Sequence, residues 1–203
     1  MIQPPAAARD FSIGLLLAGG ESRRMGHDKA LLPCDGFANL LHRQLALLQS
    51  LSLDSCLVSR HQRHGELPLA GATLLTDLND QQHEGPLAGI AAALNACPQA
   101  TALLVLPVDL PCITRDVLES LLCSGREQQQ ALYFGEEYLP LYLPVNDLLR
   151  TDLNQRIGQA GSDKSVRAML RRQQAASLPV PDPILFTNTN TPEEWQACQP
   201  RSF

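Results

Sequence analysis

A glycine-rich, positively charged segment near the N-terminus carries the residue types that bind phosphate. Residues 17–29 read LAGGESRRMGHDK, with three glycines, two adjacent arginines and a final lysine. Glycine lets backbone N–H groups approach an anion closely, and arginine and lysine neutralise its charge. Gly26 is followed by His27 and Asp28, which excludes a Walker A loop, and the spacing also excludes GxGxxG. The segment predicts a phosphate site of another kind; a basic surface loop is the alternative.

A carboxylate farther along the chain has the chemistry of a metal ligand. Asp109 lies three residues past the apolar run 102–106, on a loop stiffened by Pro107 and Pro111. Mg²⁺ prefers one or two carboxylates together with phosphate oxygens and water. We therefore expect Asp109 to hold Mg²⁺, with Asn190 as a weaker candidate for a supporting ligand. A turn residue and a helix cap, respectively, are the alternatives for these two side chains.

Alternating strand and helix patterns would position these groups. Apolar runs at residues 13–18, 55–59, 73–75 and 102–106 predict buried strands, and residues 40–51, 85–96 and 114–122, with Thr114 as N-cap, predict helices. This alternation predicts a mostly parallel sheet with helices on both faces. Such sheets bind ligands beyond the carboxyl ends of their strands. The loops after Ala18, Thr76 and Leu106 should therefore share one rim.

The remaining sequence is less regular. Residues 1–11 predict a loose tail, 131–134 and 138–143 a hairpin, 146–157 and 165–172 two helices, 185–186 a last strand and 191–199 a closing helix. The length of 203 residues suits a single domain.

The composition narrows the class of protein. With 44% hydrophobic and 18% charged residues, the chain can bury a sizeable core, and its net charge of -5 argues against nucleic-acid binding. No apolar run is long enough to span a membrane and no signal peptide begins the chain, so we expect a cytoplasmic protein with no membrane partner. The six cysteines have no paired spacing, which predicts reduced, buried thiols and no zinc site.

Four segments, taken in order, resemble the molybdenum cofactor guanylyltransferases. They are LAGGESRRMGHDK at residues 17–29, GPLAGI at 85–90, PVDLP at 107–111 and NTNTPEE at 188–194. The resemblance covers about residues 12–195. It implies a Rossmann-like three-layer sandwich of the nucleotide-diphospho-sugar transferase type, with residues 1–203 forming one nucleotidyltransferase domain.

The resemblance also implies a role for each residue of the rim. The residues that would contact the nucleotide are Leu17, Ala18, Gly19, Gly20, Lys29, Ser59, Asp77 and Asp109. Lys29 would bind the triphosphate, Arg24 would support it, and Asp109 would hold Mg²⁺ with Asn190. Ser59 departs from the family, which often has asparagine at that position.

The implied reaction transfers GMP from GTP to the terminal phosphate of molybdopterin and releases pyrophosphate. The second glycine of LAGG resembles the guanylyl branch, whereas the cytidylyl branch more often has LAAG. Two alternatives stay open: a transferase that uses CTP or a sugar phosphate, and a non-catalytic module that delivers the cofactor. Pyrophosphate release from GTP and molybdopterin separates the delivery module from the transferase.

The same resemblance suggests partners beyond the two substrates. Molybdenum-insertion proteins and molybdoenzyme apoproteins would receive the product, and we expect the enzyme to be a monomer. Basic side chains gather at Lys164, Arg167, Arg171 and Arg172, where they would meet the acceptor phosphate or a carrier protein. A solvated helix face is the alternative for this charged run.

Overall fold

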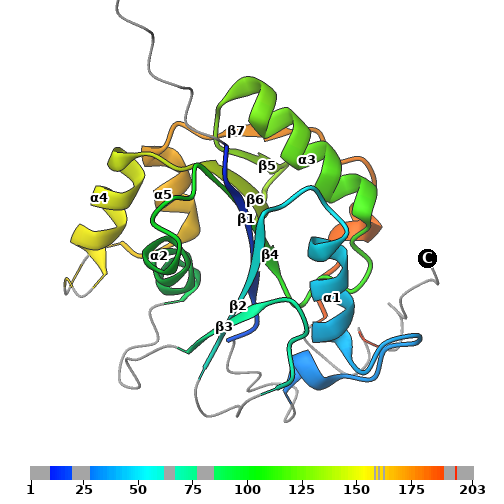
Figure 1. The fold of residues 1–203 in the computed structure, drawn as a ribbon. Coiled ribbons are helices and arrows are strands. Elements are labelled where there is room, and N and C mark those ends of the chain that lie inside the picture. The colour runs from blue at the N-terminus through cyan, green and yellow to red at the C-terminus, as the bar shows by residue number, and fades with distance from the viewer. Residues whose placement is uncertain are drawn as a thin grey trace, which may run out of the picture.

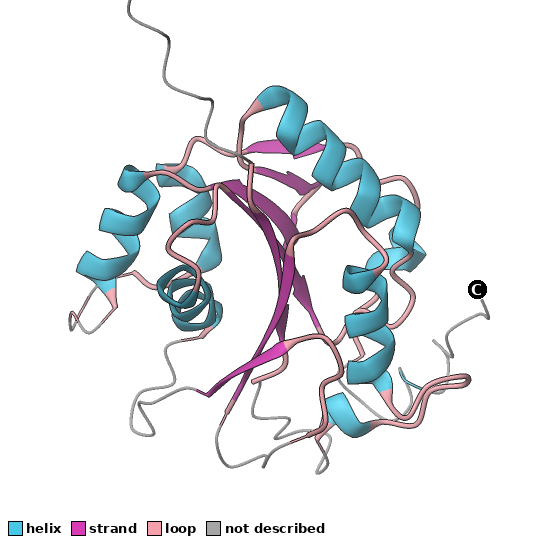
Figure 2. Cartoon of the chain, viewed as in Figure 1, coloured by secondary structure: helices cyan, strands magenta, loops and turns pink. Residues whose placement is uncertain are grey.

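The computed structural model describes residues 10–19, 28–61, 67–76, 85–157, 159, 161, 163–189 and 195. Across these ranges a seven-stranded sheet separates two groups of helices (Figure 1). Figure 2 shows the same layers, with the strands forming a twisted wall between the helices. This arrangement confirms the predicted α/β three-layer sandwich.

The strands run in one direction except for β6. Their bounds are β1 Ser12–Leu17, β2 Ser55–Arg60, β3 Thr73–Thr76, β4 Ala102–Pro107, β5 Leu132–Phe134, β6 Glu137–Pro144 and β7 Ala176–Leu178. Their spatial order is β3-β2-β1-β4-β6-β5-β7, and β6 pairs antiparallel with both neighbours. The other strands therefore end at a common edge of the sheet, which we name the carboxyl edge.

The helices divide between the two faces of the sheet. One face carries α1 Leu40–Gln49 and α3 Arg115–Gln128, and the other carries α2 Pro86–Ala96, α4 Asp147–Arg156 and α5 Val166–Arg172 (Figure 1). Along β1, Leu16 packs with the first group, whereas Ile13 and Leu15 pack with the second. Because both faces of the central strands are buried, these strands are continuous apolar runs without polar alternation.

Polar residues set the beginnings of several helices. Asn39, Asn146 and Ser165 occupy the N-caps of α1, α4 and α5, and each side chain accepts a hydrogen bond from a first-turn N–H. Thr114 occupies the predicted N-cap of α3, but its side chain makes no capping bond. The five helices predicted before residue 173 and the predicted hairpin, now β5 and β6, are confirmed.

The prediction of a last strand at residues 185–186 is wrong. These residues lie in a 3-10 helix, η3 Pro183–Phe186, because the Asp182 side chain accepts a hydrogen bond from the N–H of Ile184 and proline occupies the first turn. The strand that the pattern did not predict is β7, which pairs parallel with β5. Its three residues are too few to show a periodicity.

Helix α3 is longer than predicted. It continues to Gln128, although the pattern predicted its end at residue 122. Gly125 lies in this extension of the helix. In the fold this glycine lies against the ring of Tyr142, and a Cβ at that position would come within 2.2 Å of the ring. A glycine that weakens the helix locally thus allows the helix to pack closely on the sheet.

The cysteines only partly match the expectation. Cys34, Cys56 and Cys97 are free and buried, and burial raises the pKa of the Cys56 thiol to about 11. Cys123 is free but exposed, and Cys112 is disulfide-bonded, so the prediction of reduced, buried thiols is wrong at these two positions. A disulfide depends on which segments the fold brings together, which sequence spacing does not reveal.

Some predictions fall partly outside the described ranges. Residues 1–9 of the predicted tail do so, whereas Phe11 is attached to the fold because its N–H donates to Thr101 Oγ1 at 2.9 Å. The predicted closing helix, 191–199, also lies outside the described part except for Trp195. No helix in the described part is long and apolar enough to cross a bilayer.

Candidate active site

The ends of β1 and β4 lie side by side at the carboxyl edge. The strand order reverses between them, because β2 and β3 lie on one side of β1 while β6, β5 and β7 lie beyond β4. The pairing continues past the strands: the Ala18 N–H donates to Ser59 O at 2.8 Å and the Val108 N–H donates to Leu17 O at 3.0 Å. In open α/β sheets such a reversal leaves a crevice in which ligands bind. The strand order therefore brings the loops after β1 and β4 together at the carboxyl edge, which is the predicted rim.

Lys29 and Asp109 meet at this rim. Lys29 begins the short helix η1 Lys29–Leu31, and its Nζ lies 3.7 Å from Asp109 Oδ2. The two side chains are 14% and 29% exposed, so both are shielded but can be reached from solvent. A carboxylate that suits a metal ion therefore stands beside an ammonium that suits a phosphate, as the sequence predicted.

The segment GPLAGI forms the beginning of α2 beside β1 and β2. Gly85 caps this helix with φ of 66°, a left-handed conformation that glycine adopts without strain, and Pro86 occupies the first turn. A Cβ on Gly89 would come within 2.7 Å of Leu17 Cδ2 and 2.8 Å of Ser59 Oγ. The two glycines thus let the helix begin at the rim and lie close to the strand ends.

Ser59, the predicted end of the strand, lies one residue before the end of β2, and its side chain is turned toward α2. The residue is 7% exposed and its hydroxyl lies beside Gly89. Its carbonyl accepts the Ala18 N–H, so Ser59 supports the backbone that follows β1. The Ser59 side chain therefore makes a buried contact with α2.

The Asp109 loop is held by residues that the sequence analysis did not single out. Gln44 of α1 is fully buried, and its Nε2 donates to Leu110 O at 2.6 Å. The adjacent Arg43, 3% exposed, donates from Nη2 to Ile113 O at 3.3 Å. A signal for Gln44 was present in the sequence, because leucines lie three and four residues before and after it, and such neighbours share its helix face.

The C-terminal segment passes directly beside Asp109. The Thr189 N–H donates to Asp109 O at 3.1 Å, and Thr189 is fully buried. Asn190 follows Thr189 in the chain, but it lies outside the described residues, as do Gly20, Arg24 and Asp77. Within the described ranges, no group of three potential metal ligands gathers.

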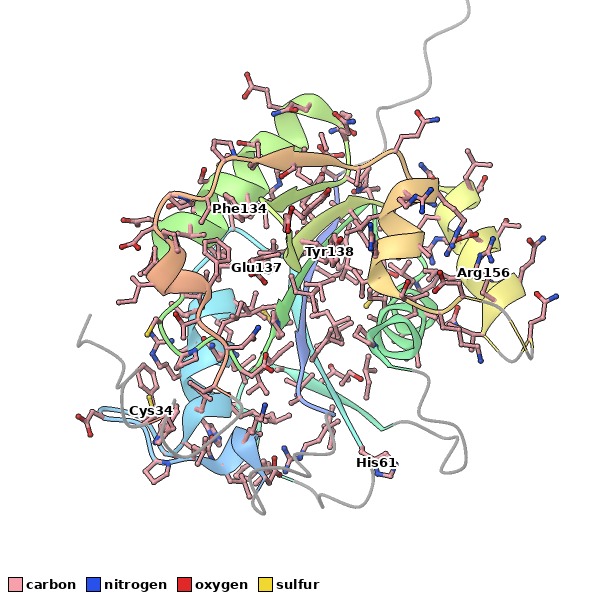
Figure 3. All side chains as sticks on the ribbon, turned by 180° about the vertical axis from the view of Figure 1, so that it is seen from behind. Cys34, His61, Phe134, Glu137, Tyr138 and Arg156 are labelled. Carbon is pink, nitrogen blue, oxygen red and sulfur yellow. The ribbon has the colours of Figure 1, made fainter. Side chains whose placement is uncertain are left out.

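Arg60 is a second residue that the sequence analysis missed. It ends β2 and forms an ion pair with Asp28, the residue before Lys29. Figure 3 shows His61, which directly follows Arg60, at the same end of the molecule as Cys34 in the loop after η1. An arginine after an apolar strand could equally point to solvent, so only the fold reveals this pair.

The basic residues of α5 lie on the other helical layer. Lys164 precedes the helix, and Arg167 and Arg171 are exposed. Arg172 instead turns toward α4, where its Nε lies 2.9 Å from Asp152 Oδ1. One of the four predicted acceptor-facing cations is therefore engaged in a contact between helices.

Comparison with known proteins identifies the family. The model of the MobA-like NTP transferase domain matches residues 14–177. A relative named molybdenum cofactor guanylyltransferase, from Xanthomonas euvesicatoria pv. vesicatoria (strain 85-10), is 35% identical over 185 residues, which cover 90% of this chain and 91% of the relative. This chain belongs to the MobA-like NTP transferase family.

Solved structures show the same fold. Molybdopterin-guanine dinucleotide biosynthesis protein A from Archaeoglobus fulgidus has a TM-score of 0.72 and 23% identity, covering 92% of this chain and 96% of that protein. A Mycobacterium tuberculosis H37Rv protein, solved in complex with manganese, has a TM-score of 0.68 and 16% identity over 94% and 98% of the two chains. At these identities the likeness concerns the fold.

Proposed function

We propose that this chain transfers GMP from GTP to the terminal phosphate of molybdopterin, forming the guanine dinucleotide cofactor and releasing pyrophosphate. One observation carries the proposal: Lys29 Nζ and Asp109 Oδ2 lie 3.7 Å apart at the carboxyl edge. The name of the 35% identical relative supplies the substrates. The geometry supports a triphosphate and a metal ion binding together at this edge.

The reaction forms a bond between an oxygen of the acceptor phosphate and the α-phosphorus of GTP. The bond from that phosphorus to the β-phosphate oxygen breaks, and pyrophosphate leaves. A phosphate monoester has a second pKa of about 6, so the attacking oxygen is already ionised near neutral pH. The chain therefore needs no general base, and its task is to position the reactants and to neutralise charge.

Lys29 and Asp109 would divide this task. The ammonium of Lys29 would bind the triphosphate and balance the negative charge that moves onto pyrophosphate. Asp109 supplies a hard oxygen donor that fits Mg²⁺, and its partial exposure leaves room for phosphate oxygens and water as further ligands. Bound Mg²⁺ would stabilise charge on the phosphate oxygens. Arg24, Asp77 and Asn190 stay predictions for supporting roles.

The choice of guanine follows from the relatives and from the second glycine of LAGG. We infer further that the enzyme works in the cytoplasm as a monomer and passes its product to molybdenum-insertion proteins or molybdoenzyme apoproteins. The location and the recipients follow from the biosynthetic role, and gel filtration tests the monomeric state.

Incubating the protein with GTP, Mg²⁺ and molybdopterin tests the proposed function. We expect stoichiometric pyrophosphate and guanine dinucleotide cofactor, and no pyrophosphate when molybdopterin is left out. Tight binding of GTP or molybdopterin without any pyrophosphate would identify a delivery protein and would refute the proposal.

A further inference from the structure

Arg60, the last residue of β2, places a positive charge inside the protein. Its side chain is 1% exposed and ranks among the largest fully buried side chains of the described residues. Removing a cation from water is costly unless a counter-charge and hydrogen bonds replace the solvent. An apolar side chain of similar volume would fill the same space without that cost. The charge of Arg60 therefore calls for an explanation beyond packing.

The partner of this cation is Asp28, which directly precedes Lys29. The Arg60 Nη2 donates to Asp28 Oδ2. The second carboxylate oxygen of Asp28 accepts a hydrogen bond from the Ala30 N–H at 3.1 Å and so caps η1. The Asp28 carbonyl also accepts the Leu31 N–H at 3.0 Å. Asp28 thus connects the end of β2 to the short helix that carries Lys29.

The end of β2 is a rigid point of attachment. Ser59 pairs with Leu17 of β1, and Arg60 itself pairs with Thr76 of β3, so the strand is still part of the sheet at Arg60. By contrast, η1 is only three residues long. Helices of this length gain little stability from their own hydrogen bonds and depend on tertiary contacts. The buried Ala30 and the Leu40 N–H, which donates to Leu32 O at 2.9 Å, hold η1 toward α1, and the Arg60–Asp28 pair attaches it to the sheet.

We propose that Arg60 is a positioning residue that acts through Asp28 to hold Lys29 opposite Asp109. This inference rests on the proposed function of the rim. Lysine has a flexible four-carbon stem, so its ammonium reaches a fixed place only when its backbone is fixed. The buried ion pair supplies that constraint from the sheet. The Lys29–Asp109 distance of 3.7 Å is the geometry that it maintains.

Substitutions at both ends of the pair test the proposal. Arg60→Met keeps much of the volume and removes the charge, and Asp28→Asn removes the charge on the other side. A displaced catalytic group lowers turnover by about 10²-fold, so we expect each single variant to lose kcat/KM for GTP on this scale. We also expect Arg60→Met to lose little more in an Asp28→Asn background, because the two residues act as one unit. Arg60→Lys should recover part of the loss.

A matched control uses the exposed pair on α3. Arg115 Nη1 lies 2.6 Å from Glu119 Oε2, and the two side chains are 43% and 40% exposed. Arg115→Met removes an exposed arginine–carboxylate contact away from the rim and should leave kcat/KM unchanged. Near-UV circular dichroism of every variant establishes that it is folded before its kinetics are compared.

Two outcomes would overturn the proposal. One is a folded Arg60→Met variant with kcat/KM like that of the wild type. The other is a loss in the double variant that equals the product of the two single losses, which would show that Arg60 acts independently of Asp28. Titration of Mg²⁺–GTP by calorimetry separates this failure from failure of the proposed function. If the wild type binds GTP but transfers nothing, the proposed reaction fails. The GTP affinities of the wild type, the two single variants and the double variant would then still test whether Arg60 acts through Asp28.

Discussion

Two aspartate–arginine clusters in this fold use the same chemistry for different purposes. At the carboxyl edge, Asp28 binds the buried Arg60 and is itself 15% exposed. Between α4 and α5, Asp152 binds Arg156 at 2.7 Å and Arg172 at 2.9 Å. The two aspartates differ in their surroundings. Asp28 directly precedes Lys29 of the candidate active site, whereas Asp152 joins helix α4 to helix α5.

The second cluster lies away from the rim. Figure 3 shows Arg156 at the outer end of α4, well separated from His61 at the end of β2. Partial burial raises the pKa of Asp152, but hydrogen bonds and charge from Arg156 and Arg172 outweigh it and hold that pKa below its ordinary value. Its expected contribution is therefore to stability alone. If this contrast is right, substitutions at the carboxyl edge should lower activity, and substitutions at Asp152 should lower only stability.

The largest effect should come from the active side, at Asp109. Asp109→Asn keeps the shape of the side chain but removes the charge that balances Lys29 and suits a divalent cation. We expect nucleotidyl transfer to fall by about 10²–10³-fold, the scale seen when one charge-stabilising group is lost. The rate of pyrophosphate release measures this, and circular dichroism checks the fold. Transfer at the wild-type rate in Asp109→Asn would remove Asp109 from the reaction.

An intermediate effect should follow from loosening the loop that carries Asp109. Gln44→Leu removes the buried side-chain donor to the carbonyl of Leu110, which keeps only the Ile113 N–H at 3.2 Å. Loss of one buried hydrogen bond costs about 0.5–1.5 kcal/mol of unfolding free energy, which urea denaturation measures. We also expect a fall in kcat that is smaller than for Asp109→Asn, because the catalytic group is still present. A loss of stability with unchanged kcat would show that the loop needs no support from α1.

The smallest effect should come from the structural cluster. Asp152→Asn should lower stability by about 1 kcal/mol or less at neutral pH and leave transfer unchanged, because the pair is partly exposed. A depressed folded-state pKa stabilises the protein above the unfolded value of about 4, and this stabilisation is lost as pH falls through the folded value. The wild type should therefore lose more stability than Asp152→Asn does as pH falls below about 4. Parallel thermal unfolding of the two proteins across pH 2–7 tests this, and identical pH profiles would contradict it.

The sequence predicted the structure correctly where the environment of a residue depends on its near neighbours in the chain. The continuous apolar runs of β1 and β4 predicted their bounds to within one residue, because strands buried on both faces need no polar partner. The meeting of Lys29 and Asp109 was also predictable, since the carboxyl ends of parallel strands share an edge.

The sequence was uninformative where the partner lies far along the chain. Arg60 is separated from Asp28 by 32 positions, and nothing local distinguishes it from a solvated arginine. Strand β7 forms because β5 offers it a pairing edge, and its own three residues carry no pattern. Gln44 falls between these cases, because its leucine neighbours predict burial but do not identify the carbonyl that it binds.

The most direct test of the account compares GTP with CTP in the transfer reaction, using the wild type and Lys29→Ala. If the carboxyl edge binds the triphosphate through Lys29, the wild type should release pyrophosphate with GTP and molybdopterin and prefer GTP to CTP. Lys29→Ala should then lose about 10²-fold or more in kcat/KM with its fold intact. Equal rates in the two proteins would contradict the account of the site, and a preference for CTP would contradict the assignment of the base.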